Sequence, residues 1–280
     1  MIAPRRFLAG VVASLLFVLG VGAFPASAHG DLHEQIEAAT ARIRANPGNA
    51  QLVFHRAELY RDHEEWALAA VDYDRAEKLA PGNVVVRLGR GRLWLAMGKL
   101  DAAKIELDAF LAVEPKNSGA LADRAQLAQT QARFDDASAD YALAIEHADP
   151  ADAELYLGRA RAQASAGKID AALAGLDEGS LRLGHPATLG LLAVELERGR
   201  GHFDAALGRI ETMRAGAARQ EAWLERRGDV LLAAGRADEA RRAWADSLLA
   251  LDSLPTRLAG TESMQALRRR LNTKLAVATR

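Results

Sequence analysis

Small and bulky apolar residues recur along the chain at a fixed interval. An alanine returns every 34 or 35 residues, each time in a helix-like run: Ala69, Ala103, Ala137, Ala172, Ala206 and Ala240. Twelve residues before each of them stands another small residue, or valine in one unit: Ala57, Gly91, Ala125, Ala160, Val194 and Gly228. One helical turn after each alanine stands a bulky residue: Tyr73, Leu107, Tyr141, Leu176, Ile210 and Trp244. The pattern predicts two antiparallel helices per repeat, packed closely at their small residues.

Glycine marks the turn inside several repeats. Three segments place glycine where the first helix ends and aspartate where the second begins: Gly98-Lys99-Leu100-Asp101, Gly167-Lys168-Ile169-Asp170 and Gly235-Arg236-Ala237-Asp238. Pro81 and Pro115 are also 34 residues apart, and Pro150 lies near the next expected position. Because one helix pair cannot bury its own apolar face, we expect the pairs to stack into a curved solenoid.

Over residues 47–254 this pattern resembles the tetratricopeptide repeat, with Tyr60 and Trp94 at the aromatic position late in the first helix. The resemblance implies an all-α, right-handed α-solenoid of stacked antiparallel helix pairs. We place its six units near residues 50–83, 84–117, 118–151, 153–186, 187–220 and 221–254. A small position kept as Ala76 and Ala144 is Phe110, Met213 and Ser247 in units two, five and six. We therefore expect units five and six to pack irregularly.

Segments on both sides of the solenoid, placed at residues 49–254, carry their own patterns. Residues 1–28 are typical of a secretory signal, with Arg5 and Arg6, an apolar run over 7–24, and Pro25-Ala26-Ser27-Ala28 as a cleavage site. Within 29–48, an N-terminal half-repeat helix is predicted by the apolar stripe of Leu32, Ile36, Ala39 and Ile43. Within 255–280, a basic capping helix is predicted by Met264, Leu267, Leu271 and Leu275, opposite Arg268, Arg269 and Lys274.

The signal segment favours export, with the periplasm as the expected compartment. The alternative is an inner-membrane anchor through an uncleaved signal, because about 18 apolar residues is the lower limit for spanning a bilayer. The absence of cysteine excludes disulfides and thiol nucleophiles. A formal charge of −1, or −3 without Arg5 and Arg6, gives no bulk attraction to nucleic acid. A basic end, from Arg257 to Arg280, follows an acidic body.

The sequence lacks the motifs of an enzyme, so we predict no catalysis and no cofactor. Gly89-Arg90-Gly91 starts like a dinucleotide-binding loop, but Trp94 occupies the position of its third glycine. Ser180 lacks the flanking glycines of a nucleophile elbow. The acidic groups Asp135-Asp136, Asp72 with Asp74, and His63-Glu64-Glu65 are interpreted as lying near helix starts, where they would stabilise the helix dipole.

Histidines near the expected cleavage site offer an alternative, metal-handling function. Cleavage after Ala28 would make His29 the first residue, whose amine and imidazole could bind copper together with His33. The plainer interpretation is that both are solvated, because no carboxylate-rich surroundings are evident to orient them. We therefore predict no metal.

The resemblance also implies a binding surface. In this family the first helix of each unit lines the concave side, and the residue after the small position points into it: Glu58, Arg92, Gln126, Arg161, Glu195 and Asp229, to which we add Arg61. An extended peptide with acidic and then basic groups would be complementary. Phe54 and Glu58 differ from the lysine and asparagine with which one branch of the family grips a C-terminal carboxylate.

The predicted function is an exported scaffold that binds a protein or peptide partner, not nucleic acid, in its concave groove. A second alternative is membrane-surface association through the basic C-terminal helix, which carries Arg268, Arg269, Arg270 and Lys274. Its apolar stripe is more simply explained by burial against unit six.

Overall fold

The computed structural model describes residues 26–278, and these residues form helices without any strand. In chain order the helices are α1 (Ala26–Ala45), α2 (Ala50–Asp62), α3 (Trp66–Leu79), α4 (Val84–Ala96), α5 (Leu100–Leu111), α6 (Ser118–Thr130), α7 (Phe134–His147), α8 (Ala153–Ser165), α9 (Ile169–Leu183), α10 (Ala187–Gly199), α11 (Phe203–Gly216), α12 (Glu221–Ala233), α13 (Ala237–Asp252), α14 (Thr256–Ala259) and α15 (Glu262–Ala278). The all-α fold predicted from the repeat is confirmed.

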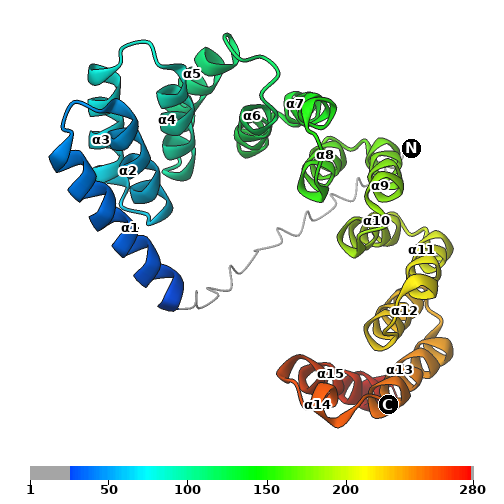
Figure 1. Ribbon diagram of the computed structural model, residues 1–280. Helices are drawn as coiled ribbons and strands as arrows, with labels where there is room; N and C mark the ends of the chain where they lie inside the picture. The colour runs from blue at the N-terminus through cyan, green and yellow to red at the C-terminus, as the bar shows by residue number, and fades with distance from the viewer. Residues whose placement is uncertain (1–25, 279–280) are drawn as a thin grey trace, which may run out of the picture.

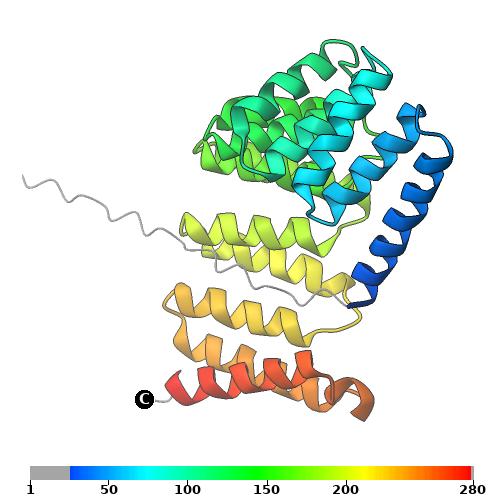
Figure 2. The same ribbon diagram turned by 90° about the vertical axis from the view of Figure 1, so that its left-hand side faces the viewer.

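The helices α2 to α13 form successive pairs that stack into an open ring (Figure 1). The first helix of each pair lies on the inner side of the curve and the second on the outer side. In the side view the last pairs lie one above another, and α15 closes the C-terminal end (Figure 2). The α-solenoid with a helix at each end is therefore present as predicted.

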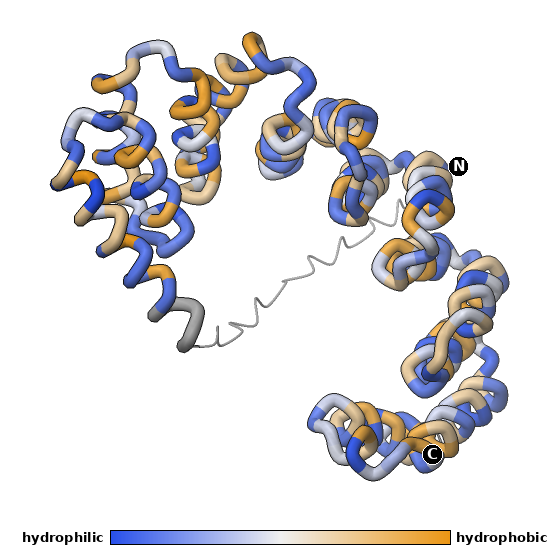
Figure 3. The backbone as a smooth tube through the Cα atoms, viewed as in Figure 1, coloured by the Kyte–Doolittle hydropathy of each residue, from blue (hydrophilic) through white to orange (hydrophobic). Residues whose placement is uncertain are grey.

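The repeated positions of the sequence form the contact between the helices of each pair. All six periodic alanines have no exposed surface, and the residues twelve positions earlier are buried as well. The bulky residues that follow the alanines are also buried, with Tyr141 the most exposed of them at 9%. Hydropathy accordingly alternates around each helix, with apolar stripes between polar ones (Figure 3).

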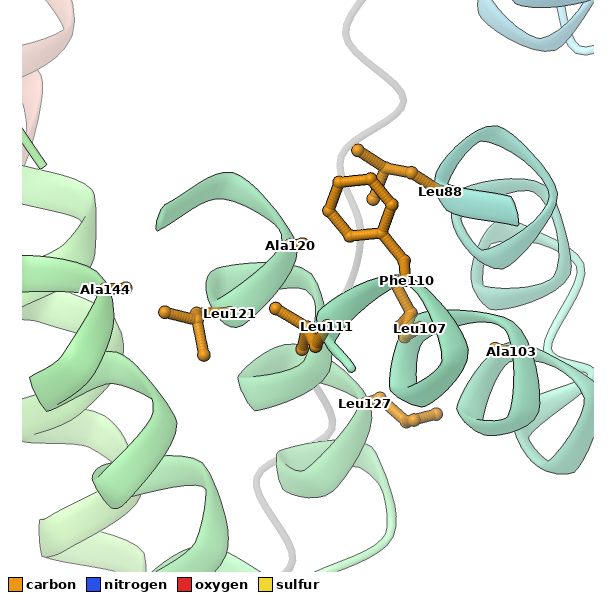
Figure 4. Close-up of a cluster of buried hydrophobic side chains, with 9 residues drawn as sticks. All are labelled: Leu88, Ala103, Leu107, Phe110, Leu111, Ala120, Leu121, Leu127 and Ala144. Carbon is orange, nitrogen blue, oxygen red and sulfur yellow. The ribbon is translucent and has the colours of Figure 1, made fainter. Parts of the chain in front are cut away.

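The core is a row of small apolar clusters, because each helix pair contacts only its neighbours. One cluster draws its side chains from α4, α5, α6 and α7 and contains Phe110, whose ring lies beside Leu88 (Figure 4). Phe110 thus fills space at a position where units one and three keep Ala76 and Ala144. In the later units Met213 lies against Gly190, and Ser247 is buried and donates a hydrogen bond to the carbonyl oxygen of Glu221 at 2.6 Å.

Left-handed backbone occurs at the turn inside every helix pair. The predicted glycines Gly98, Gly167 and Gly235 have φ of 70°, 77° and 75°, and Gly201 has 77°. Two pairs use a residue with a side chain at this point, Glu64 and Ala132. Such residues cost about 1–2 kcal/mol in this conformation, because their Cβ approaches the following carbonyl oxygen.

The aspartates after the turns lie at the starts of the second helices as predicted, whereas the interpretation of Asp72 and Asp74 was wrong. The aspartates after the turns do not cap the second helices, since the N-cap residues are Lys99, Lys168 and Arg236 and make no side-chain cap bond. The aspartates lie inside the first turn, where they still interact favourably with the helix dipole. Asp72 and Asp74 lie in the middle of α3, where Asp72 is buried.

The true caps belong to the first helices and were missed. Asn49, Asn83, Asn117 and Asp152 precede α2, α4, α6 and α8, and each accepts a hydrogen bond from a backbone amide of the first turn. Their spacing of 34, 34 and 35 residues was visible in the sequence. At the starts of α10 and α12 the residues are Pro186 and Gln220, without side-chain cap bonds. The last two units depart from the earlier ones here too.

A ladder of arginine–carboxylate pairs joins the units. The arginines share one repeat position, immediately before the small residue of the first helix: Arg56, Arg90, Arg124, Arg159 and Arg227. Arg124 donates to both oxygens of Asp140 at 2.7 Å and to Asp108 of the preceding unit at 3.1 Å. Arg56 holds buried Asp72 in the same way, at 2.6 and 2.9 Å. In unit five the arginine is replaced by Ala193, which interrupts the ladder.

The end helices use the predicted stripes. In α1, Ile36, Ala39 and Ile43 are buried, and in α15 Leu267 and Leu271 join the cluster around Trp244. Within the described residues, we find no helix with both the length and the hydropathy required to cross a membrane. Residues 1–25, most of the predicted signal segment, lie outside that part of the chain.

Candidate functional site

A hollow on the inner side of the solenoid brings three of the predicted groove residues together. Its volume is about 520 Å³, and Arg61 of α2, Arg92 of α4 and Gln126 of α6 all line it. The rest of the wall is apolar or neutral apart from one carboxylate: Leu95, Ala96, Gly98, Leu100, Asp123 and Thr130. The hollow therefore offers hydrogen-bond donors beside an apolar surface.

Arg92 is held in place by a neighbouring unit. Its Nε donates to Oδ2 of Asp123 at 2.6 Å, and the side chains of both residues are partly exposed. Among the described residues, its two terminal nitrogens donate no hydrogen bond. A guanidinium has five N–H donors in a planar fork, so four of them remain for a ligand that enters the hollow.

Glu58 points to the inner surface, but its carboxylate is already engaged. It accepts a hydrogen bond from the Tyr73 hydroxyl and lies 3.0 Å from Nη2 of Arg61. Burial raises the pKa of the Tyr73 phenol, and the bond to Glu58 raises it further, so the phenol stays protonated and donating. The effect is to orient Arg61, which lines the hollow, while leaving little free acid beside it.

Two buried tyrosines of the outer helices pack against a glycine of the next inner helix. A Cβ at Gly89 would collide with the ring of Tyr73, and a Cβ at Gly158 would collide with the ring of Tyr141. The Tyr141 hydroxyl donates to Oε1 of Gln129 at 3.0 Å. This pairing of tyrosine with a glycine 16 or 17 residues later was visible in the sequence and was missed.

Arg161 lies in the same region as Arg92. Burial raises the pKa of the Tyr141 phenol, Arg161 lowers it, and Asp123 and Glu154 raise it. These three charged groups are therefore within electrostatic reach of one hydroxyl, and Asp123 is the residue that holds Arg92. Arg161 is exposed and, among the described residues, forms no ion pair, and Gln126 is exposed as well.

The acidic part of the predicted groove is neutralised by the chain itself. Glu195 lies 2.5 Å from Nη2 of Arg198 on the same helix. Asp229 accepts hydrogen bonds from Nζ of Lys274 at 2.6 Å and from the Trp244 indole at 3.1 Å. Helix α15 thus supplies an ion-pair partner to the last of the predicted positions, although the Asp229 side chain stays partly exposed.

The basic C-terminal helix uses most of its cations internally. Arg270 and Lys274 donate to the carboxylate of Glu225 at 2.9 to 3.0 Å, and Arg268 lies 2.7 Å from Asp252. Burial raises the pKa of Glu225, and the bonds from Arg270 and Lys274 outweigh it, so the pKa lies below its ordinary range. Only Arg269 of the four cations proposed for a membrane surface has no ion pair within the described residues.

The histidine candidates for metal binding are at the start of α1. His33 is exposed, and its Nε2 lies 3.4 Å from Oε1 of Glu37, a carboxylate that the sequence interpretation had overlooked. His29 lies on the same helix, and its side chain is outside the described part of the structure. No group of three or more His, Asp or Glu side chains suited to a metal occurs among the described residues.

Comparison with known proteins agrees with this architecture. Residues 154–267 match the sequence model of the tetratricopeptide repeat-like domain. No curated protein is detectably similar to the chain in sequence.

Solved structures of low sequence identity share the fold. A tetratricopeptide repeat protein from Parabacteroides merdae is 18% identical, with a TM-score of 0.55 over 91% of this chain and 94% of that chain. The C-terminal part of a TPR repeat-containing protein from Cytophaga hutchinsonii is 13% identical, with a TM-score of 0.65 over 82% of this chain and 94% of that chain. PilF of Pseudomonas aeruginosa is 13% identical, with a TM-score of 0.53 over 79% and 97%.

At these identities the likeness concerns the fold alone. The described chain has the fold of a tetratricopeptide-repeat solenoid, and residues 154–267 carry a tetratricopeptide repeat-like domain.

Proposed function

We propose that this protein is a non-catalytic scaffold of the periplasm that binds a protein partner on the inner surface of its solenoid. The hollow lined by Arg61, Arg92 and Gln126 carries the proposal, because it combines unused donors with an apolar wall. A solenoid of this fold is consistent with protein interaction, since its curvature creates an extended concave surface. The signal-like residues 1–28 support export.

Affinity capture from a bacterial cell envelope tests the binding. The wild-type chain is compared with the double variant Arg92→Glu/Arg161→Glu, and retained proteins are identified by mass spectrometry. We expect specific proteins that the wild type retains and the variant loses. The control is Lys78→Glu/Lys116→Glu, which reverses the same number of charges at exposed positions away from the hollow. Equal retention by wild type and both variants would contradict the proposed surface.

Export is tested separately, by expressing the full chain in a Gram-negative host. Cleavage after Ala28 should give a periplasmic protein whose mass corresponds to a chain beginning at His29. An uncleaved chain in the membrane fraction would support the anchored alternative, and an uncleaved chain in the cytoplasm would contradict export.

A further inference from the structure

The charges on the inner surface are not balanced along its length. In the C-terminal half, Glu195 is paired with Arg198, and Asp229 with Lys274. In the half that contains the hollow, Arg161 has no ion-pair partner among the described residues, and Arg92 uses a single nitrogen for Asp123. Of the predicted basic and then acidic groove positions, the two arginines therefore keep unused donors, while the two carboxylates are paired.

The two arginines lie on either side of a neutral amide. Arg92, Gln126 and Arg161 occupy the same repeat position on α4, α6 and α8, each directly after the small residue. Helix α6 contacts both α4 and α8. Glu154 on α8 is an exposed carboxylate within electrostatic reach of the same Tyr141 hydroxyl, and it has no ion pair in the part of the chain that the structure describes. The Tyr141 hydroxyl is bound to Gln129, so it is not a free donor.

From this arrangement we propose, on the basis of the function proposed above, that the partner presents an extended acidic segment to the inner surface. One carboxylate binds the free edge of Arg92, a second binds Arg161, and the backbone between them meets the amide of Gln126. An apolar side chain next to the first carboxylate packs on Leu95 and Leu100, which line the hollow. A guanidinium edge matches the two oxygens of a carboxylate, which gives two parallel hydrogen bonds.

The distance between the two arginines sets the spacing of the carboxylates. Packed helices lie about 8–10 Å apart, so two steps from α4 to α8 span about 16–20 Å. An extended chain rises about 3.3 Å per residue, so the two acidic residues should be about five or six positions apart. A compact acidic cluster would reach only one of the two arginines.

Selection of random peptides displayed on phage tests the proposal, with the full chain purified as it accumulates in a Gram-negative host. We expect enrichment of peptides with two aspartates or glutamates about five or six positions apart. Their affinity, measured by fluorescence polarisation, should fall at least about tenfold in Arg92→Gln and in Arg161→Gln, as expected for loss of a charge-assisted hydrogen bond. Salt should weaken binding as well.

The controls separate this inference from the proposed function. The variant Lys78→Glu/Lys116→Glu should keep the affinity, and circular dichroism should show that the two arginine variants are folded. If the selected peptides are neutral or basic but still depend on Arg92 or Arg161, the acidic partner is wrong and the binding surface stands. If no peptide is enriched, or if binding ignores both arginines, the inference and the proposed surface both fail.

Discussion

The size of individual residues in this solenoid is limited by how closely two helices approach. Gly158 is an example, because the ring of Tyr141 occupies the space that a Cβ would need. Units two and four have leucine in place of this tyrosine, and their following helices carry Asp123 and Leu192 instead of glycine. The glycine is therefore required by the aromatic ring and not by the backbone.

Replacing Gly158 with alanine should destabilise the protein by about 1–3 kcal/mol, because the added methyl group forces the Tyr141 ring or α8 to shift. The measurement is the change in urea midpoint. Combining Gly158→Ala with Tyr141→Leu should recover part of the loss, since the smaller side chain makes room. An equal loss with tyrosine or with leucine at position 141 would contradict the steric explanation.

At the scale of the helix, the arginine ladder adds ion pairs between helices that the apolar clusters already join. Arg124 of α6 contacts Asp140 of α7 and Asp108 of α5 at the same time. Burial raises the pKa of Asp108, but hydrogen bonds from Lys104 and Arg124 outweigh it and lower the pKa. The hydrogen bond to Asp140 likewise raises the pKa of Arg124, so the charged forms of Asp108 and Arg124 are favoured in the folded state.

Removing Arg124 should be costly, because it leaves the buried Asp140 without a partner. We expect Arg124→Met to destabilise the protein by about 2–3 kcal/mol, less than for a fully buried pair because the arginine is partly exposed. Thermal unfolding, monitored by circular dichroism, measures this loss of stability. The matched control is Arg133→Met, which removes a more exposed pair with Asp136 and should change stability by less than about 1 kcal/mol. Similar losses in both variants would argue against the ladder.

The attachment of α15 should depend on pH. The pKa of Glu225 is lowered in the folded chain, so its ion pairs stabilise the fold above the ordinary glutamate pKa, near 4.5, and this contribution is lost as the pH falls through the lowered value. Arg270→Met/Lys274→Met should therefore be less stable than wild type at pH 7, with the difference shrinking below about pH 4.

The thermal midpoint between pH 7 and pH 3 measures this difference. Arg269→Met serves as the control, because Arg269 is exposed and has no ion pair within the described residues. If the difference in thermal midpoint between wild type and the double variant stays constant over this pH range, protonation of Glu225 does not explain the loss of stability.

For the whole molecule, stability should vary along the solenoid because each unit contacts only its neighbours. The pair α10–α11 has the weakest attachment by three criteria. Its first helix lacks a side-chain cap, Ala193 interrupts the arginine ladder, and α11 buries only Ala206 and Ile210.

Native-state hydrogen exchange should therefore find the lowest protection among the six pairs in α10–α11. Pairs α2–α3 and α6–α7 serve as internal controls, because each has both an asparagine cap and a ladder arginine. Uniform protection from α2 to α13, or lower protection in the two control pairs, would contradict this view.

The sequence alone determined the helix pairs, their stacking and the stripes of the end helices. Each of these depends on residue size at a fixed interval: the alanine positions from Ala69 to Ala240 must be small wherever two helices touch, so packing leaves a periodic trace. The asparagine caps and the tyrosine–glycine pairs left such a trace too, although it was overlooked. The ion-pair partners of the charged side chains left no such periodic trace in the sequence. A charged residue at a repeat position contacts whichever neighbour the curvature of the solenoid brings near.

Only the tertiary structure decided which groove positions are free. Arg161 and Asp229 occupy equivalent places in their repeats, yet Asp229 is paired with Lys274, which is 45 residues further along the chain, while Arg161 is exposed and has no ion pair among the described residues. The same repeat position therefore has different neighbours at the middle of the solenoid and at its end. Ion pairing depends on atoms a few ångströms apart, and the fold brings those atoms together from helices that the sequence keeps far apart.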